Sequence, residues 1–216
     1  EGRWEAFRIC EASRNGERAL FVVGSDPRGT AYGVLELSRL LGVSPWEWWA
    51  DVAPRCVRNV TLAPGYDRAE APSVQYRGIF LNDEDWGLTP WASQTFEPER
   101  GNIGPRTYAK VCELLLRLKA NYLAPAMHPV STSFNQIPEN KLVADTFAIV
   151  MGSTHREPLL LNTASEWDSK TMGDWDYVNN RAGVARVLKE RVETSAPYEN
   201  VYTLALRGLH DRAMAG

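Results

Sequence analysis

The sequence predicts an α/β protein whose parallel strands end in polar and charged side chains. Two apolar runs of strand length, Arg77–Leu81 and Val201–Leu206, support this prediction because each stops abruptly at such residues. Helical patterns with one apolar face separate the strand-like runs, and the order strand, helix, strand indicates parallel crossovers. Because the carboxyl ends of parallel strands meet at one edge of a sheet, we expect a site at that edge.

The first 72 residues are predicted to form an N-terminal accessory α/β domain, of which the chain holds the end. Ala19–Val23 is typical of a buried strand, and Gly24–Gly29 is expected to form a turn. Thr30 is expected to cap a helix that ends at Leu41. Val57–Thr61 is a further strand candidate. The apolar positions of the helix recur at helical spacing and are Val34, Leu37, Leu40 and Leu41.

Residues 73–216 are predicted to form the first half of a (β/α)8 barrel. The expected strands and helices alternate, and in chain order they are Arg77–Leu81, Pro105–Lys119, Asn121–Ala126, Pro138–Asp145, Phe147–Met151, Tyr177–Glu193 and Val201–Leu206. A complete barrel of this kind takes about 250 residues, so four strands correspond to an incomplete one. A smaller open sheet is the alternative.

Composition excludes several classes of protein. The net charge of −3 and the lack of a basic tract argue against broad nucleic-acid binding. No apolar stretch approaches the length of a membrane span, and the charged start of the chain is not a signal peptide. Three cysteines without metal-like spacing indicate neither a disulfide framework nor a zinc site, and no cofactor is predicted. The 8 tryptophans either fill a core or stack on sugars.

The segment after the first barrel strand is rich in groups for acid–base chemistry. Asn82, Asp83 and Glu84 follow the strand directly, and Asp85 and Trp86 come next. Glycoside hydrolysis needs two carboxyl groups, one protonated and one ionised. Asp83 is a candidate for one of them. Clustered acids also bind Mg²⁺ or Ca²⁺, so a hard-cation site is the alternative, and Asp85 is interpreted as a solvated loop acid.

The fourth predicted strand brings an arginine and the second carboxylate. Strand alternation directs Thr203, Ala205 and Arg207 inward, and it directs the other side chains, those of Tyr202, Leu204 and Leu206, towards the helices. An inward arginine suits a carboxylate, which its planar fork binds bidentately, although Arg207 could instead pair with Asp211 or Asp83. Asp211 follows a different strand from Asp83, so the two carboxylates could face each other across a barrel mouth.

Two histidines follow the middle strands. His155 lies beside Arg156 and Glu157 after the third predicted strand, and His128 lies after the second. Their position at strand ends makes His155 and Arg156 candidates for substrate binding, together with Asn82, Glu84, Trp86 and Arg207. The surroundings do not support a Ser-His-Asp hydrolase, because no acyl-transfer elbow accompanies them.

Several long segments, taken in order, resemble the xylan α-glucuronidases of glycoside hydrolase family 115. They are Phe21–Asp51, Tyr76–Trp91, Leu118–Met127, Ile149–Pro158 and Glu199–Met214. The resemblance implies a large enzyme with an N-terminal α/β domain, a catalytic (β/α)8 barrel and further domains. It also implies inverting removal of glucuronic or 4-O-methylglucuronic acid from glucuronoxylan.

The resemblance also carries roles to individual positions. Asn82 and Asp83 match the site after the first strand, His155 matches the loop after the third, and Arg207 and Asp211 match the loop after the fourth. A further glutamate expected later in the barrel has no counterpart, so we expect the chain alone to be inactive. The sequence departs from the family pattern around Ala124 and His128, where aromatic residues are common.

The family resemblance and the incomplete barrel also lead to expectations about where the protein is located and how it assembles. The resemblance favours an extracellular or periplasmic protein, and an uncovered half barrel favours self-association into a homo-oligomer. Another barrel glycosidase, an α-glucuronidase of family 67 or a β-hexosaminidase of family 20, is one alternative. The hexosaminidase would need an Asp-Glu doublet where this chain has His210-Asp211. A non-catalytic carbohydrate-binding module is the rival from another class.

Overall fold

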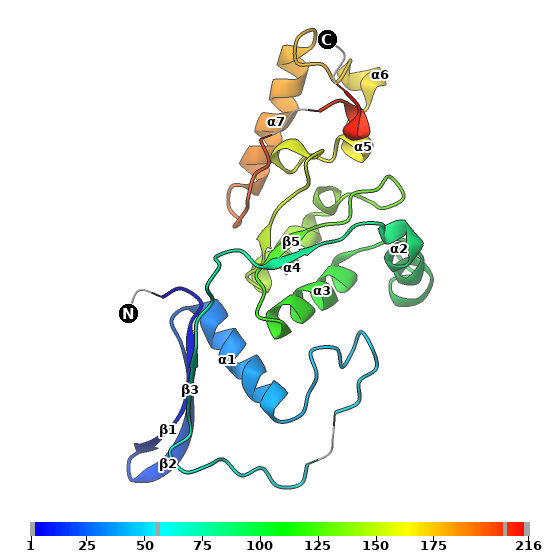
Figure 1. Cartoon of the computed structure of the whole chain (residues 1–216). Helices are drawn as coiled ribbons and strands as arrows, with labels where there is room; N and C mark the ends of the chain where they lie inside the picture. Colours follow the sequence, from blue (N-terminus) through cyan, green and yellow to red (C-terminus); the bar gives the residue numbers. More distant parts are fainter. Residues whose placement is uncertain (1–2, 55–56, 205–206, 214–216) are drawn as a thin grey trace. The chain divides into compact units, whose positions relative to one another are not determined.

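The computed structural model describes residues 3–54, 57–204 and 207–213 (Figure 1). The chain is a mixed α/β protein, which confirms the predicted class. It divides into two compact units, Glu1–Arg77 with Glu113–Asn121 and Gly78–Cys112 with Tyr122–Gly216. No helix in the described ranges combines the length and the apolar character that crossing a membrane requires.

The sheet of the first unit is antiparallel. It contains β1 (Phe7–Arg14), β2 (Glu17–Gly24) and β3 (Asp67–Glu70) in the order β2-β1-β3. The Asn15-Gly16 turn joins β1 to β2, and its φ angles of 55° and 84° are both positive, as a type I′ hairpin requires. The sequence prediction missed β1 and β3.

The predicted strand at Val57–Thr61 is wrong. These residues form no strand, and Val57 and Val60 are both more than half exposed, so the segment has no apolar face to bury. The register opposite β1 is taken instead by β3, in which Glu70 lies opposite Phe7.

Helix α1 (Pro27–Leu40) begins three residues before the predicted cap at Thr30. The side chain of Asp26 accepts a hydrogen bond from the Gly29 amide at 2.8 Å, and Pro27 occupies the first turn, where its missing N–H costs nothing. The buried residues of this helix are Gly29, Tyr32, Gly33 and Glu36. Of its apolar positions, Val34 is 52% exposed, so the buried face is displaced from the one that apolar spacing marks.

A small apolar core holds the first unit together. Phe7 and Ile9 from β1 pack against Tyr32 from α1, and all three are buried. The partly buried residues around them are Leu20, Val22, Leu37, Tyr66 and Leu116.

Two buried carboxylates organise the polar side of this unit. Glu5 accepts hydrogen bonds from Arg28 at 3.0 Å and from Asn121 at 2.7 Å, and it also binds Arg77. Glu36 binds three cations, those of Arg39, Arg68 and Lys119. Hydrogen bonds from Arg39, followed by those from Lys119, lower the pKa of Glu36 to about 2.

The sheet of the second unit is parallel. It contains β4 (Gly78–Phe80), β5 (Tyr122–Ala124) and β6 (Val150–Met151) in that order. Gly78 lies opposite Tyr122, where a Cβ atom would come within 1.8 Å of the Tyr122 carbonyl oxygen, so only glycine fits this pairing.

The fourth predicted strand, Val201–Leu206, is reduced to one bridge. Met151 pairs in parallel with Asn200, and the Val201 amide donates to the Met151 carbonyl at 2.9 Å. Residues 201–204 are not in a strand, and residues 205–206 lie outside the described ranges. Leu204 was expected to face the helices but is 86% exposed, because residues 201–204 form no regular strand that would direct it there.

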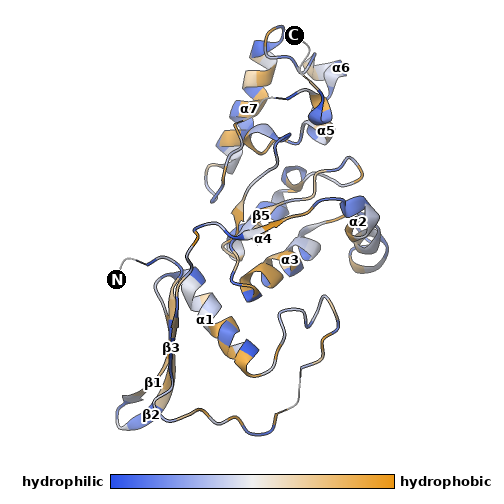
Figure 2. Cartoon of the chain, viewed as in Figure 1, coloured by the Kyte–Doolittle hydropathy of each residue, from blue (hydrophilic) through white to orange (hydrophobic). Residues whose placement is uncertain are grey.

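Helices α3 (Pro105–Arg117) and α7 (Arg181–Ser195) follow the apolar periodicity of the sequence. Tyr108, Val111, Cys112 and Leu115 of α3 are all buried, as their common face predicts. In Figure 2 apolar and polar bands alternate along α7, as expected for a helix with one buried face. After α1 the α-helices are, in chain order, α2 (Leu88–Trp91), α3 (Pro105–Arg117), α4 (Pro138–Thr146), α5 (Thr163–Glu166), α6 (Ser169–Met172) and α7 (Arg181–Ser195).

Helix α7 starts four residues later than Tyr177, its predicted first residue. The carboxylate of Asp176 accepts hydrogen bonds from the amides of Val178 and Asn179, which makes a separate turn before the helix. The described cysteines, Cys10 and Cys112, are free thiols.

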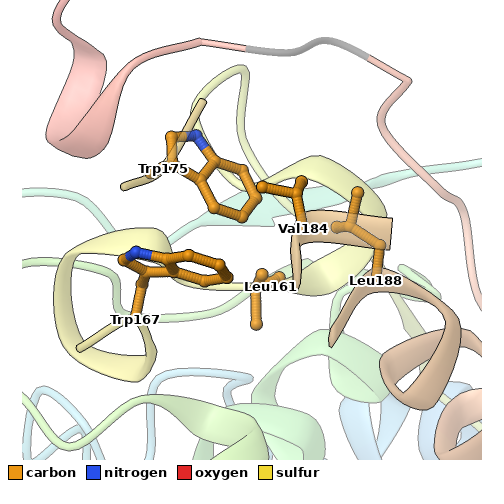
Figure 3. Packing of buried hydrophobic residues seen from close by; sticks show 5 residues of the cluster. All are labelled: Leu161, Trp167, Trp175, Val184 and Leu188. Atoms are coloured by element: carbon orange, nitrogen blue, oxygen red, sulfur yellow. The ribbon is translucent and has the colours of Figure 1, made fainter. Parts of the chain in front are cut away.

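Two tryptophans belong to the apolar core of the second unit. Trp167 and Trp175 pack edge to face with ring centroids 4.9 Å apart, and Figure 3 shows them beside Leu161, Val184 and Leu188. For these two tryptophans the core interpretation is correct. Trp175 also donates its indole N–H to the Arg207 carbonyl at 2.6 Å, which ties the last described loop to this core.

We predict that Glu5→Ala destabilises the first unit by about 3 kcal/mol, because it leaves Arg28 and Arg77 without their shared buried carboxylate. Urea denaturation of the full-length protein measures the change. Asp67→Asn is the matched control, since the Arg8–Asp67 pair is solvent-exposed and its loss should have far less effect. Equal losses of stability in the two variants would contradict the prediction.

Candidate functional site

Asn82 and Asp83 lie directly beyond the end of β4. The Leu81 amide donates to the Ala124 carbonyl at 3.0 Å, which continues the parallel pairing to the last residue before them. Asp83 has a left-handed φ of 56° and precedes a 3₁₀ turn, Glu84–Trp86. Its carboxylate is exposed, and the Asn82 amide lies 3.5 Å from it.

Glu84 points into the unit and not to its surface. The residue is 3% exposed, and one carboxylate oxygen accepts a hydrogen bond from the His128 amide at 2.6 Å. Its other oxygen is buried without a hydrogen-bond partner in the described part of the chain. Glu84 therefore holds the backbone after β5 through its hydrogen bond with the His128 amide, and its carboxylate is buried away from solvent.

Beside Asp83, three side chains with metal-ligating atoms lie close together around His128. Asp83, Asp85 and His128 each offer an atom, and these atoms lie within 4.8 Å of one another. Asp85 is exposed to solvent, as predicted, and in addition the Nδ1 atom of His128 lies 3.0 Å from its Oδ1 atom. Two carboxylates and one imidazole could hold a divalent cation.

His155, Arg207 and Asp211 form the other group. His155 Nε2 lies 3.2 Å from Asp211 Oδ2, and Arg207 pairs with the other oxygen of the same carboxylate. The hydrogen bond from His155, followed by that from Arg207, lowers the pKa of Asp211. Asp211 is thereby held in its ionised form. Beside it, Arg156 Nη1 lies 3.0 Å from His210 Nδ1.

The predicted site residues thus divide into two groups. Asn82 and Asp83 lie with the end of β4, whereas His155, Arg207 and Asp211 meet at the loop beyond the Asn200 bridge. No hydrogen bond or ion pair connects Asp83 with Asp211 in the ranges that the structure describes. Trp86 stands apart from both, since it is 85% exposed and presents a flat apolar ring to solvent.

Glu157 was not among the predicted site residues, although it is a buried acid of the second unit. Glu157 is 5% exposed, and its pKa is raised to about 7, mainly by burial and in addition by the carboxylate of Glu166. Burial also raises the pKa of Tyr108, and Glu84 and Glu157 both add to that shift. The only sequence signal is an acid between Arg156 and Pro158 at a strand end, and burial cannot be read from it.

Comparison with known proteins identifies the class to which this fold and site belong. Residues 69–216 match the family model described as glycosyl hydrolase family 115. The chain therefore belongs to glycoside hydrolase family 115, as its sequence segments indicated. No curated protein sequence matches the chain significantly.

A solved structure resembles the chain over its whole length. It is described as BtGH115A, a novel family 115 4-O-methyl-α-glucuronidase with specificity for decorated arabinogalactans. The two share 48% sequence identity, with a TM-score of 0.92. The match covers 100% of this chain and 28% of BtGH115A, so the chain spans a little over a quarter of that protein.

We predict that Glu157→Gln changes the pH dependence of stability. An unfolded glutamate titrates near 4.5, so between 4.5 and about 7 the folded protein holds a proton that the unfolded chain has lost. The wild-type free energy of unfolding therefore falls as pH rises through this window, by up to about 3 kcal/mol. Glutamine does not titrate, so the stability of the variant relative to wild type should increase with pH.

Urea denaturation of both proteins across this window measures the difference. Other titrating groups are common to the two proteins and cancel in the comparison. A constant difference from acid to neutral pH would show that Glu157 titrates normally in the folded protein.

Proposed function

We propose that the protein carrying this chain is an α-glucuronidase that removes glucuronic or 4-O-methylglucuronic acid side groups from xylan with inversion. The observation that carries this proposal is the His155–Arg207–Asp211 group, which combines an ionised carboxylate with two groups able to bind an anion. Membership of family 115 and the likeness to BtGH115A support it.

In this proposal Asp83 and Asp211 are the catalytic carboxylates. An inverting glycosidase needs one ionised carboxylate to activate water and one protonated acid to donate to the leaving oxygen. The lowered pKa of Asp211 suits the ionised role. The sugar carboxylate needs local positive charge, which the Arg207 guanidinium supplies, and the exposed ring of Trp86 offers an apolar face to a sugar.

The proposal extends to the architecture and setting of the protein. Residues 1–72 would belong to an accessory α/β domain, and residues 73–216 would be the first four βα units of a catalytic (β/α)8 barrel. The parallel order β4-β5-β6, followed by the Asn200 bridge, supports the second part. An extracellular or periplasmic location and self-association complete the proposal.

A second candidate substrate is a glucuronic-acid-decorated arabinogalactan. The observation that favours it is BtGH115A, which is described as specific for decorated arabinogalactans and shares 48% identity with this chain. Both candidates present a terminal uronic acid, so they differ in the polysaccharide backbone to which that acid is attached.

The full-length protein, incubated with glucuronoxylan oligosaccharides and with glucuronic-acid-decorated arabinogalactan oligosaccharides, tests both candidates. We expect release of glucuronic acid or its 4-O-methyl ether, first formed as the β anomer when products are followed by NMR. Release of the α anomer would rule out inversion. Binding without release would favour the carbohydrate-binding alternative.

Substitutions should separate chemistry from binding. Asp83→Asn and Asp211→Asn should each lower kcat by several orders of magnitude with little change in KM, because an amide cannot exchange the required proton. Arg207→Lys keeps the charge but loses the bidentate fork, so it should lower kcat/KM by about 10- to 100-fold. Steady-state kinetics of purified variants measure these effects, and a normal kcat in both asparagine variants would exclude the assigned pair.

A further inference from the structure

The segment Ser153–Glu157 is a turn closed by its own hydrogen bonds. The Glu157 amide donates to the Thr154 carbonyl at 3.1 Å, and the Ser153 hydroxyl donates to the Glu157 carbonyl at 2.8 Å. The Glu157 side chain returns to the start of the turn, where one carboxyl oxygen lies 3.3 Å from the Thr154 amide and 3.5 Å from its hydroxyl. The conformation of the turn therefore depends on this carboxyl group.

The two residues at the tip of this turn make the contacts of the candidate site. His155 reaches Asp211, and Arg156 reaches His210, so both partners lie on the 207–211 loop. The ends of the turn are buried, with Thr154 8% and Glu157 5% exposed, whereas the His155 side chain is 54% exposed. Buried ends with an exposed tip allow a small change at Glu157 to move His155 and Arg156 together.

The surroundings of Glu157 favour its neutral form. Burial is the main cause, and the charge of Glu166 acts in the same direction. Hydrogen bonds from Thr154 and the charge of Arg156 oppose it. The phenols of Tyr108 and Tyr122 are also close enough for Glu157 to raise the pKa of each.

We propose that the carboxyl group of Glu157 is a positioning group, which holds the 153–157 turn so that His155 and Arg156 meet the 207–211 loop. The inference rests on the proposed function for its effect on catalysis, but the geometric part stands without it. Ionisation places a buried negative charge near the carboxylate of Glu166, and the resulting repulsion would displace the turn and weaken the contact of His155 with Asp211. Glu157 touches no substrate in this proposal, and it acts through its neighbours.

A pair of substitutions of similar size separates the positioning role from simple burial. Glu157→Gln keeps an oxygen acceptor for Thr154 and cannot ionise, whereas Glu157→Met fills the same volume with no acceptor. Glu139→Gln, on the exposed face of α4, is the matched control for loss of an acid. All are made in the full-length protein.

The first measurement needs no substrate. Histidine-selective ¹³C NMR, with the His155 signal assigned through His155→Gln, follows the ring chemical shift of His155 beside Asp211. We expect Glu157→Gln and Glu139→Gln to leave this chemical shift unchanged, and Glu157→Met to change it because the imidazole moves away from Asp211. An unchanged His155 chemical shift in Glu157→Met overturns the positioning role.

The second measurement is the pH profile of kcat/KM with the uronic-acid substrate. Wild type should lose activity as pH rises above about 7, and Glu157→Gln should retain it there while matching wild type at lower pH. Glu157→Met should fall by on the order of 10- to 100-fold at every pH. A wild-type profile in Glu157→Gln, or equal losses in the Gln and Met variants, overturns the proposal. Absence of uronidase activity in every protein counts against the proposed function alone, since the NMR measurement still decides the positioning role.

Discussion

The parallel sheet begins at a reciprocal pair between Arg77 and Asn121. The Arg77 amide donates to the Asn121 side-chain oxygen at 3.0 Å, and the Asn121 amide donates to the Arg77 carbonyl at 2.8 Å. The buried Glu5 carboxylate binds both side chains, so neither can rotate away without breaking an ion pair or a hydrogen bond. The next residue on each segment opens the ladder of β4 and β5, and in a parallel sheet a shift of one residue would turn every side chain to the opposite face. The positions of Asn82 and Asp83, just beyond the end of β4, follow from this register.

The candidate site combines a rigid base with exposed functional groups. Its 207–211 loop is tied to the tryptophan cluster through the Trp175 indole, and the 153–157 turn is closed by its own hydrogen bonds. His155 and Arg207 remain about half exposed, which leaves the imidazole and the guanidinium accessible to an anionic ligand. The buried turn and the Trp175 contact fix the backbone, whereas the exposed ends of His155 and Arg207 avoid the desolvation cost of a buried charge.

Sequence periodicity predicted the elements whose apolar face is wide and failed where polar contacts decide the structure. The buried face of α3 follows from the spacing of Tyr108, Val111 and Leu115, and the parallel order follows from the alternation of elements. Strand β1 was missed because charged residues interrupt its apolar alternation, although its Asn15-Gly16 turn was a usable signal. The sequence left two interpretations of Arg207 open, binding of a ligand carboxylate and pairing with Asp211 or Asp83, and the structure shows the pair with Asp211. The burial of Glu84 and Glu157 could not be predicted, because it depends on contacts with residues distant in sequence.

The close fit between Gly152 and Tyr122 has a consequence for how this family of sequences can vary. A Cβ atom on Gly152 would lie 1.9 Å from the Tyr122 hydroxyl, so a larger residue at 152 and tyrosine at 122 are incompatible with this backbone. A side chain at 152 therefore requires a residue shorter than tyrosine at 122, whereas position 122 can change alone as long as glycine stays at 152. Among homologues, residues larger than glycine at 152 should occur together with a shorter residue at 122.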